Sequence, residues 1–159
     1  MNTSGSSRVA IAAASACLLL APLGAAACSV QEVGSDEEKF AKAKEVFLAR
    51  MVRVEEAAKP ERLGNVETKA VQGTYKLLEV FKGEPKDGDA VTDFVFNPGN
   101  CSLGIMAGLY YVFFIRPENR RVLWVHGSRG YINLEGSVPK ADLARFRALA
   151  RKVESAPNR

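Results

Sequence analysis

The fold is decided by one stretch of the chain, residues 68–81, which read TKAVQGTYKLLEVF. Val71, Tyr75 and Leu77 keep a single alternating register, which is the pattern of a strand with one buried face. Leu78 then falls on the opposite phase, although no turn residue separates it from Leu77. A slip of phase within a continuous strand indicates a β-bulge, which bends a strand round a barrel. Residues 68–81 therefore predict a long, bent strand of a curved sheet.

The segments on either side of this strand predict four more strands. In each of them, strand-forming apolar side chains occur in a short run that is bounded by turn residues. The expected strands occupy residues 45–55, 90–96, 109–115 and 122–125. Residues 59–65 and 82–88 combine glycine and proline with charged side chains, and both are expected to be turns.

Two helices are expected beside these strands. Residues 35–38, Ser-Asp-Glu-Glu, are typical of a helix start, because a capping hydroxyl precedes acids in the first turn. A second helix is predicted at about residues 139–153, where apolar side chains recur at helical spacing. Its apolar face consists of Leu143, Phe146, Leu149, Ala150 and Val153. The order of elements predicts a mainly β fold, a five-stranded OB-type barrel with a short N-terminal helix and a C-terminal helix.

The first 27 residues have the pattern of a secretory signal. They carry one charge, Arg8, then an apolar run from Val9 to Leu20 and a small-residue ending. The run is too short for a retained membrane span. We therefore expect residues 1–27 to be removed and residues 28–159 to form a single exported domain, either periplasmic or secreted.

The cysteines leave two alternatives for the start of the mature chain. Cys17 lies inside the signal, so Cys28 and Cys101 remain in a compartment where disulfides persist. In one alternative these two cysteines form a disulfide. In the other, Cys28 is the lipid-carrying cysteine of an outer-membrane lipoprotein, because residues 25–28, Ala-Ala-Ala-Cys, fit a loose version of that motif. The membrane is a partner only in the second case, which also leaves Cys101 as a lone thiol.

The charge of the chain is unevenly distributed. Residues 91–159 hold 10 basic and 5 acidic side chains, within a chain of formal net charge +4. Such an excess favours an anionic partner, for example an envelope polymer. The candidate residues for that surface are Arg116, Arg120, Arg121 and Arg129. The alternative is a solvated basic face without a partner.

The sequence gives no sign of catalysis. His126 is the single histidine, and the two mature cysteines are too far apart to be paired zinc ligands. No nucleophile elbow and no phosphate-binding loop is present. We therefore expect no enzyme activity, no cofactor and no bound metal. OB-type barrels also bind nucleic acid, but an exported protein meets little of it, so none is expected.

Several of these segments together resemble one known family. The chain is similar to the netrin-like, tissue-inhibitor-of-metalloproteinases-like OB-fold domains over roughly residues 28–135. The matching features are a mature start at Cys28, the long strand at 45–55, the segment YKLLEVFKG at 75–83, Cys101, and GLYYVFF at 108–114. The resemblance implies a five-stranded OB barrel whose N-terminal cysteine is bonded to Cys101.

The resemblance also implies a function, with one departure. In the animal inhibitors the amine and carbonyl of the first cysteine chelate a protease zinc ion, so Cys28 and Ser29 are the candidate contacts. The second family disulfide is missing at both ends, with Val30 in place of its first cysteine. The expected role is therefore a non-enzymatic binding or interaction domain with an unknown protein or polymer partner. Metalloprotease inhibition is the alternative.

Overall fold

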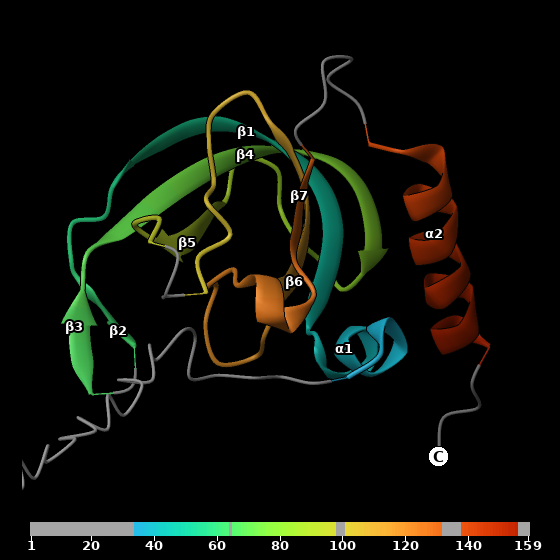
Figure 1. Ribbon diagram of the computed structural model, residues 1–159. Helices are drawn as coiled ribbons and strands as arrows, with labels where there is room; N and C mark the ends of the chain where they lie inside the picture. Colours follow the sequence, from blue (N-terminus) through green and yellow to red (C-terminus); the bar gives the residue numbers. More distant parts are fainter. Residues whose placement is uncertain (1–33, 64, 98–100, 132–137, 156–159) are drawn as a thin grey trace, which may run out of the picture.

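The computed structural model describes residues 34–63, 65–97, 101–131 and 138–155 (Figure 1). In this part of the chain a mainly β fold contains a five-stranded antiparallel sheet of order β5-β4-β1-β6-β7, a two-stranded hairpin and two α-helices. The strands of the larger sheet are β1 (Glu45–Glu56), β4 (Ala70–Lys82), β5 (Ala90–Phe94), β6 (Tyr110–Ile115) and β7 (Arg129–Tyr131). The other elements are α1 (Asp36–Lys42), β2 (Glu61–Leu63), β3 (Val66–Thr68), the 3₁₀ turn η1 (Trp124–His126) and α2 (Lys140–Glu154).

The long strands β1 and β4 curve together through the whole molecule (Figure 1). Three register shifts interrupt their pairing. At one of them Ala49 pairs with Leu77 and Leu48 pairs with Glu79, so Leu78 is the extra residue. The bulge predicted from the phase slip is therefore confirmed at the expected position. Bulges increase the twist of a strand, which is why this pair bends.

Two apolar clusters fill the two faces of the curved sheet. The cluster on the concave face is rich in aromatic rings, and Phe47 lies 4.9 Å from the Tyr75 ring and 5.6 Å from the Phe113 ring. The second cluster lies between the sheet and the two helices, with Phe40 of α1 beside Phe114 of β6. Alternation along β6 therefore sends successive side chains into different clusters.

The expected helix at the C-terminal end is confirmed and packs on the sheet. Phe146 of α2 is fully buried, and its ring lies 5.7 Å from Phe81 and 5.8 Å from Phe114. Leu149 is buried beside it, whereas Val153 on the same predicted face is exposed. Neither helix of the described residues has the length and apolar character that a membrane span requires.

The short helix α1 begins and ends through side-chain contacts. Ser35 and Glu38 form a reciprocal capping box at its start, as the sequence pattern predicts. At its end, the Lys82 ammonium donates hydrogen bonds of 2.8 Å to the carbonyls of Phe40 and Ala41. A lysine at this position satisfies carbonyls that a helix leaves unpaired. The last residue of β4 thereby fixes α1 to the end of the sheet.

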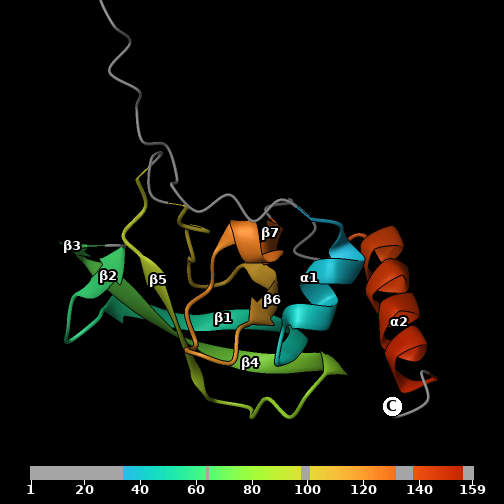
Figure 2. The same ribbon diagram turned by 90° about the horizontal axis from the view of Figure 1, so that it is seen from below.

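Residues 59–65 are not only a turn. They include β2, which pairs with β3 through Glu61 with Thr68 and Arg62 with Glu67. This hairpin lies at the opposite end of the sheet from the helices (Figures 1 and 2). The prediction was wrong here because charged side chains can point to solvent from a short strand as readily as from a turn.

The predicted strand at 122–125 is also wrong in part. Leu123 makes a single bridge with Ser102, and the chain then turns through η1, which ends at Gly127 in a left-handed conformation. The strand that pairs with β6 on the side away from β1 is β7, at residues 129–131. Glycine adopts this left-handed backbone without steric cost, so Gly127 ends the turn and shifts the strand onward.

The larger sheet is not closed by a continuous ladder. Its edge strand β5 meets the segment after β6 at one isolated parallel bridge between Thr92 and Arg121. The Thr92 N–H donates to the Arg120 carbonyl at 3.0 Å, and the Val122 N–H donates to the Thr92 carbonyl at 2.8 Å. The described residues therefore form a strongly curved sheet with one bridge between its two sides, and the expected closed barrel is not confirmed.

Candidate functional site

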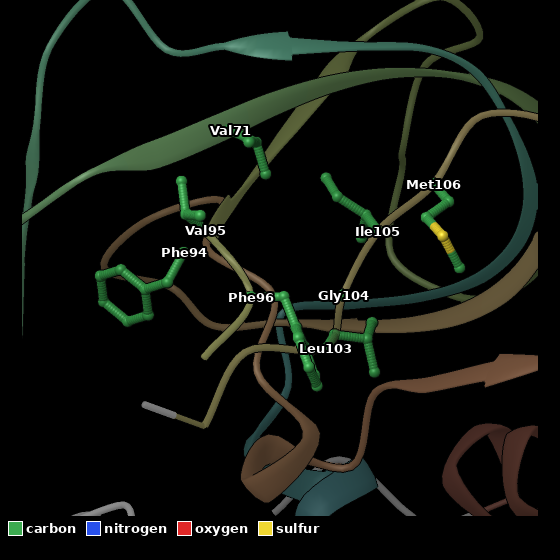
Figure 3. A pocket seen from close by; sticks show the side chains of 8 residues that line it. All are labelled: Val71, Phe94, Val95, Phe96, Leu103, Gly104, Ile105 and Met106. Carbon is green, nitrogen blue, oxygen red and sulfur yellow. The ribbon is translucent and has the colours of Figure 1, made fainter. Parts of the chain in front are cut away.

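An apolar pocket of about 460 Å³ opens at the edge of the sheet next to the loop 101–106 (Figure 3). It is lined by β4, by the end of β5 with the residues that follow it, and by the loop. The lining residues are Val71, Phe94, Val95, Phe96, Leu103, Gly104, Ile105 and Met106. Ligand pockets commonly enclose about 300–1,000 Å³, so this volume is large enough for a ligand group.

Part of the lining is exposed to solvent. Phe96 is 68% exposed, Met106 is 48% exposed and Val95 is 42% exposed. Phe94 and Ile105, in contrast, belong to the buried core. Large apolar side chains that stay exposed around a hollow mark a site where a partner or ligand removes them from water.

A buried carboxylate holds the loop in place. Asp93, the penultimate residue of β5, has no exposed surface. Its two oxygens accept hydrogen bonds of 2.8–3.3 Å from the Ser102 hydroxyl and from the N–H groups of residues 103–105. The Phe94 N–H donates to the same carboxylate at 2.9 Å. Burial raises the pKa of Asp93, and the hydrogen bonds that it accepts oppose this rise.

A tyrosine holds the other end of the same loop. The Tyr111 hydroxyl accepts a hydrogen bond of 2.9 Å from the Met106 N–H and donates one of 3.2 Å to the Gly104 carbonyl. Burial raises the pKa of Tyr111, so the hydroxyl keeps its proton at neutral pH. With Asp93 at one end and Tyr111 at the other, residues 102–106 are fixed before any ligand arrives.

Gly104 brings the loop against the Phe96 ring. Its φ of +71° is a left-handed conformation, and a Cβ added there would lie 3.2 Å from Cδ2 of Phe96. A side chain at this position would therefore be strained and would also press on the ring. Glycine allows the loop backbone to form one wall of the pocket directly below Phe96.

Trp124 is another exposed aromatic residue, and it follows a residue that is bridged to the loop. Ser102 forms a bridge with Leu123, and the next residue, Trp124, is 53% exposed. Trp124 thus follows directly on a residue that pairs with the loop. Tryptophan and phenylalanine are both enriched among the residues that dominate binding energy at protein interfaces.

One feature of the sequence does indicate this site, although the strand pattern alone does not reveal it. From Val95 to Ile115 the chain has no Asp, Glu, Lys, Arg or His. Part of this stretch is the buried strand β6, but residues 101–109 belong to no strand or helix. Loops on a protein surface are usually polar, so an uncharged loop with Leu103, Ile105 and Met106 indicates a functional surface.

The predicted basic residue Arg120 is part of an internal network. Its guanidinium donates to Glu45 and the Tyr75 hydroxyl at 2.9 and 2.7 Å and to the Ala90 carbonyl at 2.9 Å. Asp89 lies 3.9 Å from the same group. Burial of the phenol raises the pKa of Tyr75 to about 12. Arg120 therefore joins β1, β4 and β5 at the side of the sheet where the single bridge lies.

Arg121 and Arg129 also pair with carboxylates of the chain. Arg121 forms an ion pair with Glu61 of β2 and lies over the Phe94 ring, 4.9 Å from its centroid. Arg129 of β7 donates two hydrogen bonds, of 2.6 and 2.7 Å, to Asp36 at the start of α1. Both arginines thus connect elements that are distant in sequence.

The four predicted arginines do not lie together as one open basic surface. Arg116 is buried, and the guanidinium groups of Arg120, Arg121 and Arg129 each face an acid. These ion pairs neutralise positive charge that would otherwise attract an anionic polymer. Binding of such a polymer remains a prediction, and these contacts do not favour it.

A second hollow, of about 550 Å³, is polar and lies over the turn before β5. It is lined by Lys44, Glu45, Gly83, Glu84, Lys86 and Asp89. Glu45 and Asp89 both face Arg120. Because Arg120 already pairs with these two acids, we take the apolar pocket as the stronger candidate for a binding site.

The cysteine predictions fall partly outside the described residues. Cys101 is 2% exposed and packs with Phe94, Leu123 and Val125 below the pocket. Cys28 and Ser29 lie outside the described residues, so the disulfide, the lipid anchor and the contact with a protease zinc all remain predictions. His126 is half-buried at the end of η1.

Within the described residues, no group of three or more His, Cys, Asp or Glu side chains is placed to hold a metal ion. The chain matches no protein-family model, and no curated protein matches it.

Proposed function

We propose that this chain is an exported, non-enzymatic binding domain with an OB-type barrel, and that the apolar pocket beside loop 101–106 is its binding surface. The observation that carries the proposal is the combination of exposed Phe96 and Met106 with a loop that Asp93 and Tyr111 hold rigid. Binding to a loop that is already ordered loses less conformational entropy than binding to a mobile one.

The strand order supports the OB-type barrel. The strands β1, β4, β5, β6 and β7 correspond in sequence order to the five strands of such a barrel. In that arrangement the third and the fifth strand meet in parallel. The bridge between Thr92 of β5 and Arg121 is also parallel, and Arg121 belongs to the segment that leads from β6 to β7. The Arg120 side chain reinforces this contact with a hydrogen bond to the Ala90 carbonyl of β5, and ion pairs tie Arg120 to Glu45 of β1 and Arg121 to Glu61 of β2.

The composition of the pocket supports binding rather than catalysis. None of the described residues that line it carries a group that titrates or acts as a nucleophile near neutral pH. Catalytic sites depend on such groups, whereas an apolar surface gains free energy simply by leaving water.

Site-specific photo-crosslinking in cells that express the protein tests this proposal. A benzophenone amino acid replaces Phe96 in one variant and Val80 in the other. Val80 is the matched control, because it is an exposed apolar residue of β4 that does not line the pocket. We expect a discrete adduct from position 96 and none from position 80. Failure of position 96 to give any adduct, or the same adducts from both positions, would reject the pocket as the binding surface.

A further inference from the structure

We infer that the pocket binds one large, uncharged apolar side chain that is presented by a segment of another polypeptide. This inference rests on the binding role proposed above and specifies the class of partner. Three features of the described residues support it: the neutral lining, the aromatic side chains nearby, and an edge strand that is already occupied.

The first feature is the absence of charge in the lining. Among the residues that the structure describes, no acidic or basic side chain lines the pocket, and the sequence has none between Val95 and Ile115. Arg121 lies over the Phe94 ring, but its charge is paired with Glu61. A fatty acid or a phospholipid would bring a carboxylate or phosphate to the mouth of the pocket. Such a group needs a cation or several N–H donors to replace its water, so a neutral side chain is the better match.

The second feature is the type of exposed residue. Phe96, Met106 and Trp124 are all about half exposed or more. Aromatic residues and methionine are enriched where proteins contact other proteins, and an apolar side chain in a pocket is the usual anchor of such contacts. The volume of about 460 Å³ is sufficient for one large anchor side chain with part of its neighbours.

The third feature excludes another way of binding a polypeptide, by strand addition to β5. At the outer edge of β5, Thr92 already exchanges two backbone hydrogen bonds with residues 120 and 122. The Ala90 carbonyl accepts from Arg120, and the Phe94 N–H donates to the Asp93 side chain. An extra strand needs these groups to be free. A partner at the pocket therefore cannot add as a strand to β5, which leaves its side chains as the means of recognition that this inference uses.

Selection from a random peptide display library on the purified protein tests the inference. We expect the selected peptides to share one large apolar residue with uncharged neighbours. Their affinity should fall by about tenfold or more for Phe96→Glu and for Leu103→Glu, because both changes place a charge at the anchor. Val80→Glu is the matched control, with an equal change of charge outside the pocket, and should bind as the unmodified protein does. Equal unfolding midpoints of the variants show that each one is folded.

Five results would overturn the inference. Selected peptides with acidic or basic anchors would do so, and so would peptides that bind all three variants alike. Octanoate that displaces the peptides more strongly than octanol would indicate a fatty-acid site. Self-association in sedimentation that Phe96→Glu abolishes and Val80→Glu preserves would assign the pocket to a second copy of this chain. Failure to select any peptide at millimolar sensitivity would reject a polypeptide partner.

The failure of this inference can be distinguished from the failure of the proposed function. If cross-linking at position 96 yields an adduct with a lipid or a glycan, the binding role stands and the polypeptide partner is wrong. If it yields no adduct, the proposed binding surface itself is wrong.

Discussion

Asp93 is a buried acid that faces hydrogen-bond donors instead of a cation. Five N–H or O–H groups point at its two oxygens, and four of them come from residues 102–105. Nothing in the strand pattern of residues 90–96 distinguishes this acid from one that points to solvent. Its role depends on a loop that begins eight positions later, at Cys101, and long-range pairing of this kind is not visible in local sequence.

The pKa of Asp93 leads to a prediction about pH. Because burial raises the folded-state pKa above 3.8, the folded protein binds this proton more tightly than the unfolded chain does. The stability from this group is therefore complete below pH 3.8 and is lost as pH rises through the raised pKa. Asp93→Asn removes this dependence of stability on pH. It also replaces one accepting oxygen by an NH2 group, which cannot accept from the N–H donors of the loop. We expect urea unfolding to show a less stable variant whose deficit relative to wild type shrinks as pH rises. A deficit that grows with pH would contradict the raised pKa.

Gly83 and Gly88 form a matched pair for a test of backbone strain. Both have positive φ, +77° and +79°, but a Cβ on Gly83 would lie 2.6 Å from the Lys44 carbonyl oxygen, and one on Gly88 would contact nothing. Gly88→Ala should therefore cost about 1–2 kcal/mol of unfolding free energy. Gly83→Ala should cost more, because the backbone must also move. Chemical denaturation of both variants measures the difference, and equal losses would show that the turn adapts freely.

At the scale of elements, α2 offers the clearest test of packing. Phe146→Ala should destabilise the protein by about 3–5 kcal/mol, because a fully buried ring is removed from between Phe81 and Phe114. Val153→Ala, on the exposed end of the same helix, is the control and should change stability by less than about 0.5 kcal/mol. Thermal and urea unfolding measure both. Similar small losses for the two variants would mean that α2 is only loosely attached.

The elements differ in how far the sequence could predict them. β1, β4, β6 and α2 were predictable because each has many apolar residues, either at strand or helix spacing or, in β6, in a continuous run. The hairpin of β2 and β3 was not, since three-residue strands carry too little pattern and their charged side chains resemble a turn. The last strand lies at residues 129–131 instead of 122–125, because Gly127 allows a turn before it. No spacing of apolar residues in the sequence indicates that turn.

The candidate site was less predictable than the fold for a related reason. Val95 and Phe96 continue the alternation of β5, so the pattern assigned them to a strand. The strand ends at Phe94, because the Asp93 side chain takes the Phe94 N–H and the loop takes the Phe94 carbonyl. The exposure of Phe96 is thus a tertiary effect. The lack of charge from Val95 to Ile115 was the only local indication.

At the scale of the whole molecule, the fate of Cys28 decides how the N-terminal segment is attached. We expect a disulfide with Cys101, which in the chain-entropy account would contribute about 4 kcal/mol for so long a loop. Cys101→Ser should then lower the melting temperature under oxidising conditions and leave it unchanged in reductant. Equal melting of the two proteins in both conditions would contradict the bridge.

Intact mass spectrometry of the exported protein separates the two alternatives for Cys28. A chain that begins at Cys28 and lacks two hydrogens indicates the disulfide. A mass increase of several hundred daltons indicates lipid, in which case the N-terminal amine is blocked and zinc chelation by Cys28 is impossible.

Because Thr92 and Arg121 form a single bridge, we expect this side of the sheet to open locally more often than the rest. β1 and β4 are joined by a long ladder, whereas β5 contacts residues 120–122 through two backbone hydrogen bonds and one from the Arg120 side chain to the Ala90 carbonyl, with ion pairs nearby. Local opening is easiest where few bonds must break. In hydrogen exchange, the amides of Thr92 and Val122 should therefore exchange faster than those in the centre of β1, and exchange at equal rates would contradict this. The contact between β5 and residues 120–122 can open locally while the pairing of β1 with β4 stays formed. β5 is also the strand that carries Asp93, the acid that holds the loop.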